Sequence, residues 1–102
     1  MNNLIVQKYG GSSLATLEQI DFVTKKIKKR LNDVNKIVIV VSAMGDTTDE
    51  LVALSENFLK DNKDVENLRD FDQLLSTGEI ISASLMSMSL RNNNVKAVSL
   101  TG

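Results

Sequence analysis

Apolar residues gather in three short runs, separated by longer stretches in which apolar positions recur with helical spacing. The runs lie at 4–9, 36–42 and 95–100 and are rich in the branched side chains that favour β-strands. The middle run, KIVIVVS, has no alternating polar positions, which is typical of a parallel strand that is covered on both faces. The pattern therefore predicts three β-strands.

The first stretch between strands predicts a helix from about 16 to 32. It begins with a capping box, in which the hydroxyl of Thr16 precedes Gln19 by three residues. Its cationic residues gather in the last turns, where they complement the helix dipole. The expected core-facing stripe consists of Leu17, Ile20, Val23, Ile27 and Leu31.

The second stretch predicts three further helices. One begins at another capping box, Thr47 to Glu50, with Thr47 as the expected N-cap. The others are expected at about 65–76 and 79–91, with a break at Thr77-Gly78. The element order β-α-β-α-α-α-β predicts an α/β fold with a mostly parallel sheet and helices on its faces. The side chains expected to be buried here are Leu51, Leu54, Phe58, Leu59, Ile80, Ile81, Leu85, Met88 and Leu90.

Composition excludes several classes of function. A net charge of −1 provides no basic field for nucleic acid or an acidic membrane. The longest apolar run, Ile37 to Val41, is far shorter than the ~20 residues of a membrane span. Cysteine and histidine are absent, which rules out thiolate nucleophiles and any site that depends on imidazole. No secretory signal is visible at the start, so a cytoplasmic protein is expected.

The chain length of 102 residues predicts one domain. Three strands would form a narrow sheet with two apolar, unprotected edges. The chain also stops directly after a strand, at Thr101-Gly102, where a ligand loop would be expected to begin. We therefore expect residues 1–102 to be the N-terminal portion of a larger α/β domain.

The segment KYGGSS, residues 8–13, carries the main candidate chemistry. It follows the first strand, at the kind of strand end where open α/β sheets bind ligands. Gly10 and Gly11 would let a ligand approach the backbone, whose amides could hold phosphate oxygens, and Lys8 adds a compact positive charge. The spacing is neither that of a P-loop nor G-x-G-x-x-G. The alternative reading is a strand-to-helix turn that simply needs glycine.

Four motifs together resemble the aspartokinases of the amino acid kinase family: KYGGSS, VVSAMGDTTDEL, LLSTGE and the terminal AVSLTG. The resemblance extends from about Ile5 to Gly102. It implies a three-layer α/β/α fold like that of carbamate kinase, of which this chain is the N-terminal part. It also implies transfer of phosphate from ATP, with Mg²⁺, to the side-chain carboxylate of L-aspartate. That reaction begins the synthesis of lysine, threonine and methionine, and the full-length protein is expected to be a homo-oligomer.

The resemblance also assigns roles to individual residues. Lys8 would reach the ATP phosphates and stabilise charge during transfer, while Ser42, Thr48 and Glu79 would contact aspartate, Glu79 through its α-ammonium group. Helix capping by Thr48 and a favourable first-turn position for Glu79 remain as structural alternatives. No metal ligand is assigned. The residues expected around the ATP phosphates are Lys8, Tyr9, Gly10, Gly11, Ser12 and Ser13, with Tyr9 equally readable as a packing aromatic.

Other parts of the family's machinery would lie beyond Gly102. They are the group for the substrate α-carboxylate, a second catalytic aspartate, the adenine pocket and the regulatory ACT domains. We therefore expect residues 1–102 alone to be inactive. Two alternatives remain: another amino acid kinase, such as glutamate 5-kinase or a nucleoside monophosphate kinase, and a non-catalytic α/β module that assembles through its open sheet edge.

Overall fold

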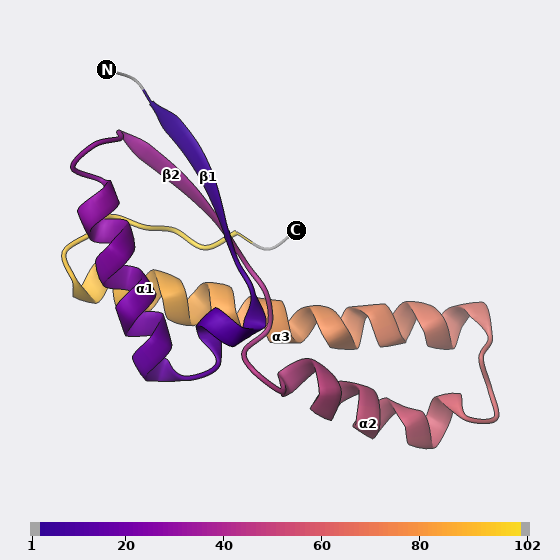
Figure 1. Cartoon of the computed structure of the whole chain (residues 1–102). Coiled ribbons are helices and arrows are strands. Elements are labelled where there is room, and N and C mark those ends of the chain that lie inside the picture. The colour runs from indigo at the N-terminus through magenta and orange to yellow at the C-terminus, as the bar shows by residue number, and fades with distance from the viewer. Residues whose placement is uncertain (1–2, 101–102) are drawn as a thin grey trace.

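Two parallel strands and three α-helices make up the computed structural model, which describes residues 3–100 (Figure 1). Thr101 and Gly102, the end of the AVSLTG motif, lie outside the described residues. The elements in chain order are β1 (Leu4–Tyr9), the 3-10 helix η1 (Gly11–Leu14), α1 (Leu17–Arg30), β2 (Lys36–Val41), α2 (Thr47–Leu59) and α3 (Val65–Asn92).

The sheet consists of β1 and β2, paired in parallel from Leu4 opposite Lys36 to Tyr9 opposite Val41. The predicted parallel pairing is therefore confirmed. The prediction that β2 is covered on both faces is wrong for the described residues, because α1 and α3 pack against one face only. On the other face Val38 and Val40 remain 47% and 45% exposed.

Residues 95–100 do not form the expected third strand. The segment is extended, and alternate side chains, Val95 and Ala97, pack against the core. Its only recorded backbone–backbone hydrogen bond within residues 3–100 joins the Val95 N–H to the Leu90 carbonyl, at 3.0 Å. A strand requires a neighbour to complete its ladder, and no strand of the described chain lies beside this segment.

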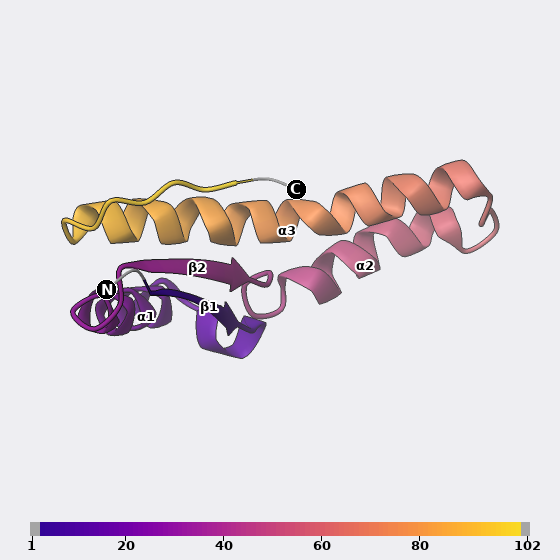
Figure 2. The ribbon, with the colours of Figure 1, turned by 90° about the horizontal axis from the view of Figure 1, so that it is seen from above.

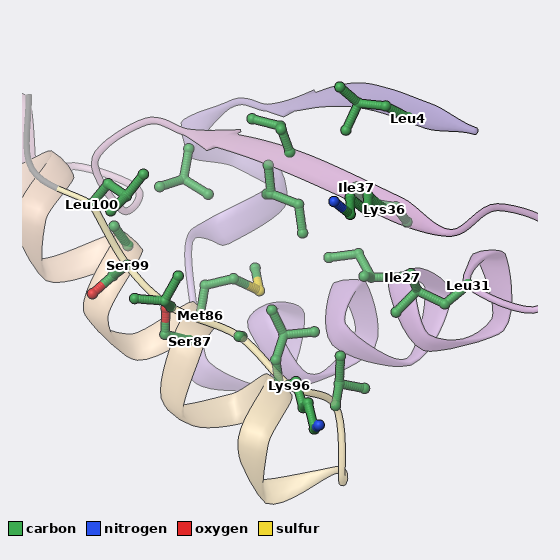
Figure 3. Close-up of a pocket in the computed structure, with 18 of the residues that line it drawn as sticks. Leu4, Ile27, Leu31, Lys36, Ile37, Met86, Ser87, Lys96, Ser99 and Leu100 are labelled. Atoms are coloured by element: carbon green, nitrogen blue, oxygen red, sulfur yellow. The ribbon is translucent and has the colours of Figure 1, made fainter. Parts of the chain in front are cut away.

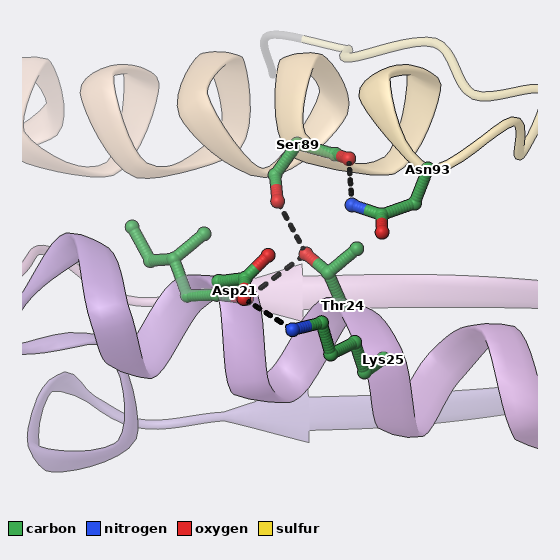
Figure 4. Close-up of polar contacts among 6 residues, drawn as sticks. Asp21, Thr24, Lys25, Ser89 and Asn93 are labelled. Carbon is green, nitrogen blue, oxygen red and sulfur yellow. Dashed lines mark hydrogen bonds and ion pairs between the residues drawn. The ribbon is translucent and has the colours of Figure 1, made fainter.

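The core lies where α1 and α3 meet beneath the sheet. Thr16 caps α1 as predicted, since its side chain accepts a hydrogen bond from the Gln19 N–H. A polar contact crosses the same interface: the fully buried Thr24 donates to the Ile20 carbonyl at 2.9 Å and lies 2.8 Å from the Ser89 hydroxyl (Figure 4). The buried apolar cluster consists of Leu14, Ile20, Val23, Ile27, Met86 and Leu90.

Helix α3 is continuous through Thr77-Gly78, so the predicted break between two helices is wrong (Figure 2). Gly78 is buried, and a Cβ built on it would lie 2.9 Å from the Cβ of Ala43. Glycine in a helix interior costs about 1 kcal/mol relative to alanine. Here it allows the helix to approach a loop closely, which explains a glycine that does not end the helix.

The α2–α3 hairpin projects from the sheet, and the molecule measures 55 × 27 × 17 Å (Figure 1). Several side chains expected to be buried are consequently exposed, because no third element of the described chain covers the hairpin. The N-cap of α2 is Asp46, which makes no side-chain cap bond, and Thr47 is the first helical residue, so the predicted Thr47 cap is wrong. The exposed side chains are Leu54, Phe58, Ile80, Ile81 and Met88, and Leu17 of α1 is exposed as well.

Candidate functional site

The carboxyl ends of β1 and β2 meet at one edge of the sheet because the strands are parallel and in register. The ladder extends one step past β2, where the Ser42 N–H donates to the Tyr9 carbonyl at 3.1 Å. Both chains then leave the sheet as loops. Ligands of open α/β sheets bind beyond this edge, so the loops after β1 and β2 define the candidate site.

The first loop presents unobstructed backbone. Gly10 is extended, at φ −82° and ψ 175°, and precedes η1. No heavy atom lies within 4 Å of the position that a Gly10 Cβ would occupy. At the start of a helix the first N–H groups have no intrahelical acceptor. A phosphate could therefore approach Gly10 without meeting a side chain.

A hydrogen bond joins the second loop to the first. The Gly45 N–H donates to the Gly11 carbonyl at 3.2 Å. Gly45 adopts φ +39°, a left-handed conformation that glycine reaches without strain. A Cβ on Gly11 would lie 3.0 Å from the Ala43 carbonyl oxygen. Glycine at position 11 therefore permits the close approach of the two loops.

Helix α3 closes the arrangement from a third side. A Cβ on Gly78 would lie 2.9 Å from the Ala43 Cβ and 3.3 Å from Cγ2 of Thr47. Ala43 is only 6% exposed and lies between Gly11 and Gly78. The motifs KYGGSS, SAMGDTTDEL and LLSTGE therefore meet around one alanine, although they are far apart in the sequence.

Lys8 and Tyr9 lie on opposite faces of β1. Lys8 is exposed and pairs with Val40, and no ion pair to it is recorded within residues 3–100. Tyr9 is half-buried against the core and donates to Oε1 of Gln7 at 3.0 Å. Burial raises the pKa of the Tyr9 hydroxyl above its ordinary value. The lysine is thus free to reach a ligand, whereas the tyrosine ring takes part in packing.

The remaining candidate residues occupy the same end of the molecule at different depths. Ser12 and Ser13 are exposed on η1, and Ser42 is half-buried directly after β2. Thr48 is the exposed second residue of α2, so it is not the N-cap. Glu79 is exposed in the middle of α3, beside buried Gly78, which rules out the first-turn interpretation of this glutamate.

The described residues 3–100 contain no group of three or more Asp, Glu, His or Cys side chains that could hold a metal ion. Mg²⁺ is commonly held by substrate phosphates, waters and one or two carboxylates. A bound Mg²⁺ would therefore not require such a cluster among residues 3–100. In the same range, no helix combines the length and apolarity that a membrane span requires.

The sequence did not predict the structural roles of two residues of the site, Ala43 and Gly45. Ala43 is an ordinary small residue after a strand, and its position between two glycines follows only from the fold. Gly45 could have been suspected of a positive φ from its place in a loop, but its bond to Gly11 could not. Sequence reasoning proposed candidate ligand-binding residues and missed the contacts that hold their loops together.

The fold and the arrangement of these motifs are those of one protein family. Residues 3–102 match the model of the amino acid kinase family, so the chain belongs to that family. The structure also resembles a crystal structure of aspartate kinase from Synechocystis, with a TM-score of 0.85 and 41% sequence identity. That similarity covers 96% of this chain and 16% of the other, and it confirms the α/β amino acid kinase fold.

Several curated relatives of the chain are aspartokinases. The chain is 46% identical over 99 residues to the aspartokinase of Geobacillus stearothermophilus and 42% identical to aspartokinase 2 of Bacillus subtilis (strain 168). It is 37% identical to the aspartokinase of Helicobacter pylori (strain ATCC 700392 / 26695). Each similarity covers 97% of this chain and 23% or 24% of the relative. The chain therefore spans about a quarter of the length of these aspartokinases.

Proposed function

We propose that this chain forms the phosphate-binding part of an aspartokinase, which transfers a phosphoryl group from ATP to the side-chain carboxylate of L-aspartate. The observation that carries the proposal is the meeting of three motif segments around Ala43, at the carboxyl ends of β1 and β2. The relatives that share these segments are named aspartokinases.

The reaction suits a chain without histidine. A carboxylate has a pKa of about 3.9 and is already deprotonated at neutral pH, so the nucleophile needs no general base. The obstacle is repulsion between an anionic acceptor and a polyanionic donor. Catalysis of phosphoryl transfer therefore depends on positioning and on neutralising charge.

Lys8 and the glycine loop would supply that neutralisation. Lys8 is exposed near the end of β1, two residues before the open backbone at Gly10. A compact charge beside free amides is a suitable cradle for phosphate oxygens. Gly11, Ser12 and Ser13 would complete this cradle, and Tyr9 would contribute only through its backbone.

The second loop and α3 would hold the acceptor. Ser42 and Thr48 flank the loop that packs on Gly11, and Glu79 follows the glycine that packs on the same loop. In the proposed complex the Glu79 carboxylate pairs with the α-ammonium of aspartate, while the two hydroxyls bind its polar groups. Contact between the loops would hold the proposed donor and acceptor sites in a fixed relation, which supports in-line transfer.

The proposal extends to the whole protein of which this sequence would be a part. Mg²⁺ would accompany ATP and reduce the charge on its phosphates, and the product would enter the synthesis of lysine, threonine and methionine. We propose a cytoplasmic homo-oligomer for the full-length enzyme. Residues 1–102 alone are expected to show no turnover.

A chimera tests the proposal. The chain replaces the aligned segment of the Geobacillus stearothermophilus aspartokinase, and the acyl phosphate formed from ATP and aspartate is trapped with hydroxylamine. Transfer to aspartate is expected, and Lys8→Met should lower kcat/KM by about 10²–10³-fold, the usual effect of removing a group that stabilises transition-state charge. Lys28→Met, at an exposed lysine of α1, is the matched control and should leave kcat/KM unchanged.

Full activity of Lys8→Met would contradict the proposed role of the lysine, and preference for glutamate would favour another amino acid kinase. The isolated chain offers a second measurement. ATP should shift the amide resonances of Gly10 and Gly11, whereas a non-catalytic assembly module predicts no shift. Turnover by the isolated chain would refute its expected inactivity.

A further inference from the structure

Charge is divided unevenly between two parts of the chain. Residues 46–79, which hold α2, the loop after it and the first half of α3, carry ten of the thirteen carboxylates. With three cationic side chains, this segment has a net charge of −7, so the other residues have a net charge of +6. Within residues 3–100, both recorded ion pairs lie outside this segment. The hairpin therefore carries a negative field that the described chain does not neutralise.

This acidic hairpin, residues 46–79, also contains an apolar hollow between α2 and α3, with a volume of about 520 Å³. Phe58 and Leu54 line the hollow while 76% and 63% exposed. Asp70 lines it as well, and Glu66 lies one turn earlier on the same face of α3. On α2, Glu50 precedes Leu54 by four residues and shares its face. The hollow thus has an apolar interior and a rim of carboxylates.

The outer face of α1 has the opposite charge. The inner face of this helix is occupied, because Ile27 and Leu31 line the space beneath β2 together with Met86 of α3 (Figure 3). On the outer face Phe22 is 64% exposed, and the Lys26 ammonium lies 5.7 Å from the centre of its ring. A cation over an aromatic face is attracted by the ring quadrupole. Apolar surface and positive charge therefore occur side by side on α1.

Further cations surround that ring. Lys25 and Lys29 follow Phe22 by three and seven residues, so they share its side of the helix. Lys25 pairs with Asp21 at 2.9 Å, whereas no ion pair to Lys26 or Lys29 is recorded within residues 3–100. The outer face of α1 thus presents an apolar centre within a frame of ammonium groups, which matches the hollow in polarity and opposes it in charge.

We propose that the hollow of the acidic hairpin binds the outer face of α1 from a second copy of this chain. Phe22 of one copy enters the hollow beside Phe58, and the lysines around it approach Asp70 and Glu66 of the other copy. One sequence supplies both complementary surfaces, which is why a second copy is the occupant. Figures 1 and 2 place α1 and the tip of the hairpin beside opposite ends of α3, so one copy cannot join its own two surfaces.

This contact goes beyond the proposed function, because it requires neither ATP nor aspartate. It joins two different surfaces, so every copy offers one α1 face and one hollow. Burial of the aromatic ring should supply most of the affinity, while the charges set specificity and salt dependence. Loss of the association would therefore leave the proposed phosphate site intact.

Sedimentation equilibrium of the 102-residue chain measures the association. Phe22→Ala should raise Kd about tenfold or more, because the buried ring is lost. Raising the salt concentration from about 0.02 M to about 0.3 M should raise Kd about threefold or more, because salt screens the charges. Lys26→Glu and Asp70→Lys should each raise Kd about tenfold, since each places like charges across the contact.

Mixing the two charge variants gives the sharpest test. An equimolar mixture of Lys26→Glu and Asp70→Lys should form mixed complexes at least as tightly as the wild type, because the intact α1 face of one variant meets the intact hollow of the other. The matched controls are Lys96→Glu and Asp72→Lys, which make the same charge changes at exposed positions outside both surfaces. They should leave Kd within about twofold, as expected for isolated surface charges.

A chain that stays monomeric at about 1 mM in low salt would overturn the proposal. Equal weakening by Lys26→Glu and Lys96→Glu would also overturn it, as would a mixture that fails to restore association. Association that is lost in Asp70→Lys but kept in Lys26→Glu would show two hairpins pairing with each other, which contradicts the proposed contact. A monomeric chain whose hollow binds only an added lysine-rich helical peptide would indicate a different partner and contradict the role of a second copy.

Discussion

Replacing Gly78 with alanine tests whether close packing at Ala43 fixes the site. The added Cβ would lie 2.9 Å from the Ala43 Cβ and 3.3 Å from Cγ2 of Thr47, which is closer than side chains normally approach. Overpacking of this kind costs about 1–3 kcal/mol, whereas alanine gains about 0.8–1.0 kcal/mol over glycine in a helix. The expected net loss is about 1 kcal/mol of unfolding free energy. For a domain of this size, that lowers Tm by about 4–8 °C.

Thermal and urea unfolding of the chain measure this loss. Gly10→Ala is the control, since no heavy atom lies within 4 Å of its added Cβ, and its stability should equal or slightly exceed that of the wild type. Ala43→Gly in the Gly78→Ala background removes one of the colliding atoms. The double variant should therefore lose less unfolding free energy than the two single variants together, by about 0.5 kcal/mol or more. A Gly78→Ala variant that gains about 1 kcal/mol would refute the packing argument, because helix propensity alone would then explain it.

Two further predictions concern the core and the sheet. Thr24→Val leaves the Ser89 hydroxyl without its partner at 2.8 Å, so the free energy of unfolding measured in urea should fall by about 1–3 kcal/mol. Adding Ser89→Ala to that variant should cost little more. Strictly additive losses from the two substitutions would contradict a shared hydrogen bond. Tyr9 is the only tyrosine and there is no tryptophan, so ultraviolet absorbance should report a tyrosinate midpoint above about 10 in the folded chain. Burial raises the pKa of the Tyr9 hydroxyl in the folded state. Its contribution to the free energy of unfolding is therefore complete below the pKa of the unfolded chain and is lost as the pH rises through the pKa of the folded chain. A titration midpoint equal to that of the denatured chain would disprove burial of the hydroxyl.

Local signals predicted the elements that depend on local physics. The branched runs predicted β1 and β2, and the Thr16 cap placed the start of α1 correctly. The N-cap at Asp46 was missed because Asp46, Thr47 and Thr48 are all plausible caps by residue type, and Thr47 is instead the first helical residue. The pattern of residues therefore predicted the presence of the helix more reliably than the residue at which it begins.

Errors arose wherever the answer depended on distant residues. Gly78 was interpreted as a break because its partner, Ala43, is 35 positions earlier and gives no local sign of the contact. Burial of Phe58 and of the outer face of β2 was overestimated, because an apolar side chain is buried only when another element covers it. The candidate residues of the site were proposed through family resemblance, whereas their mutual contacts required the fold.

The unbroken course of α3 gives this helix the mechanics of a lever. At about 1.5 Å per residue, its 28 residues form a rod about 42 Å long, with Glu79 near the middle and Met86 and Leu90 anchored in the core. Swinging the distal end at Val65 about that anchor would displace Glu79 by roughly two fifths as much, in the same direction. Because Gly78 packs closely on Ala43, a force at the tip of the hairpin would reach this carboxylate and the loop contact beside it together.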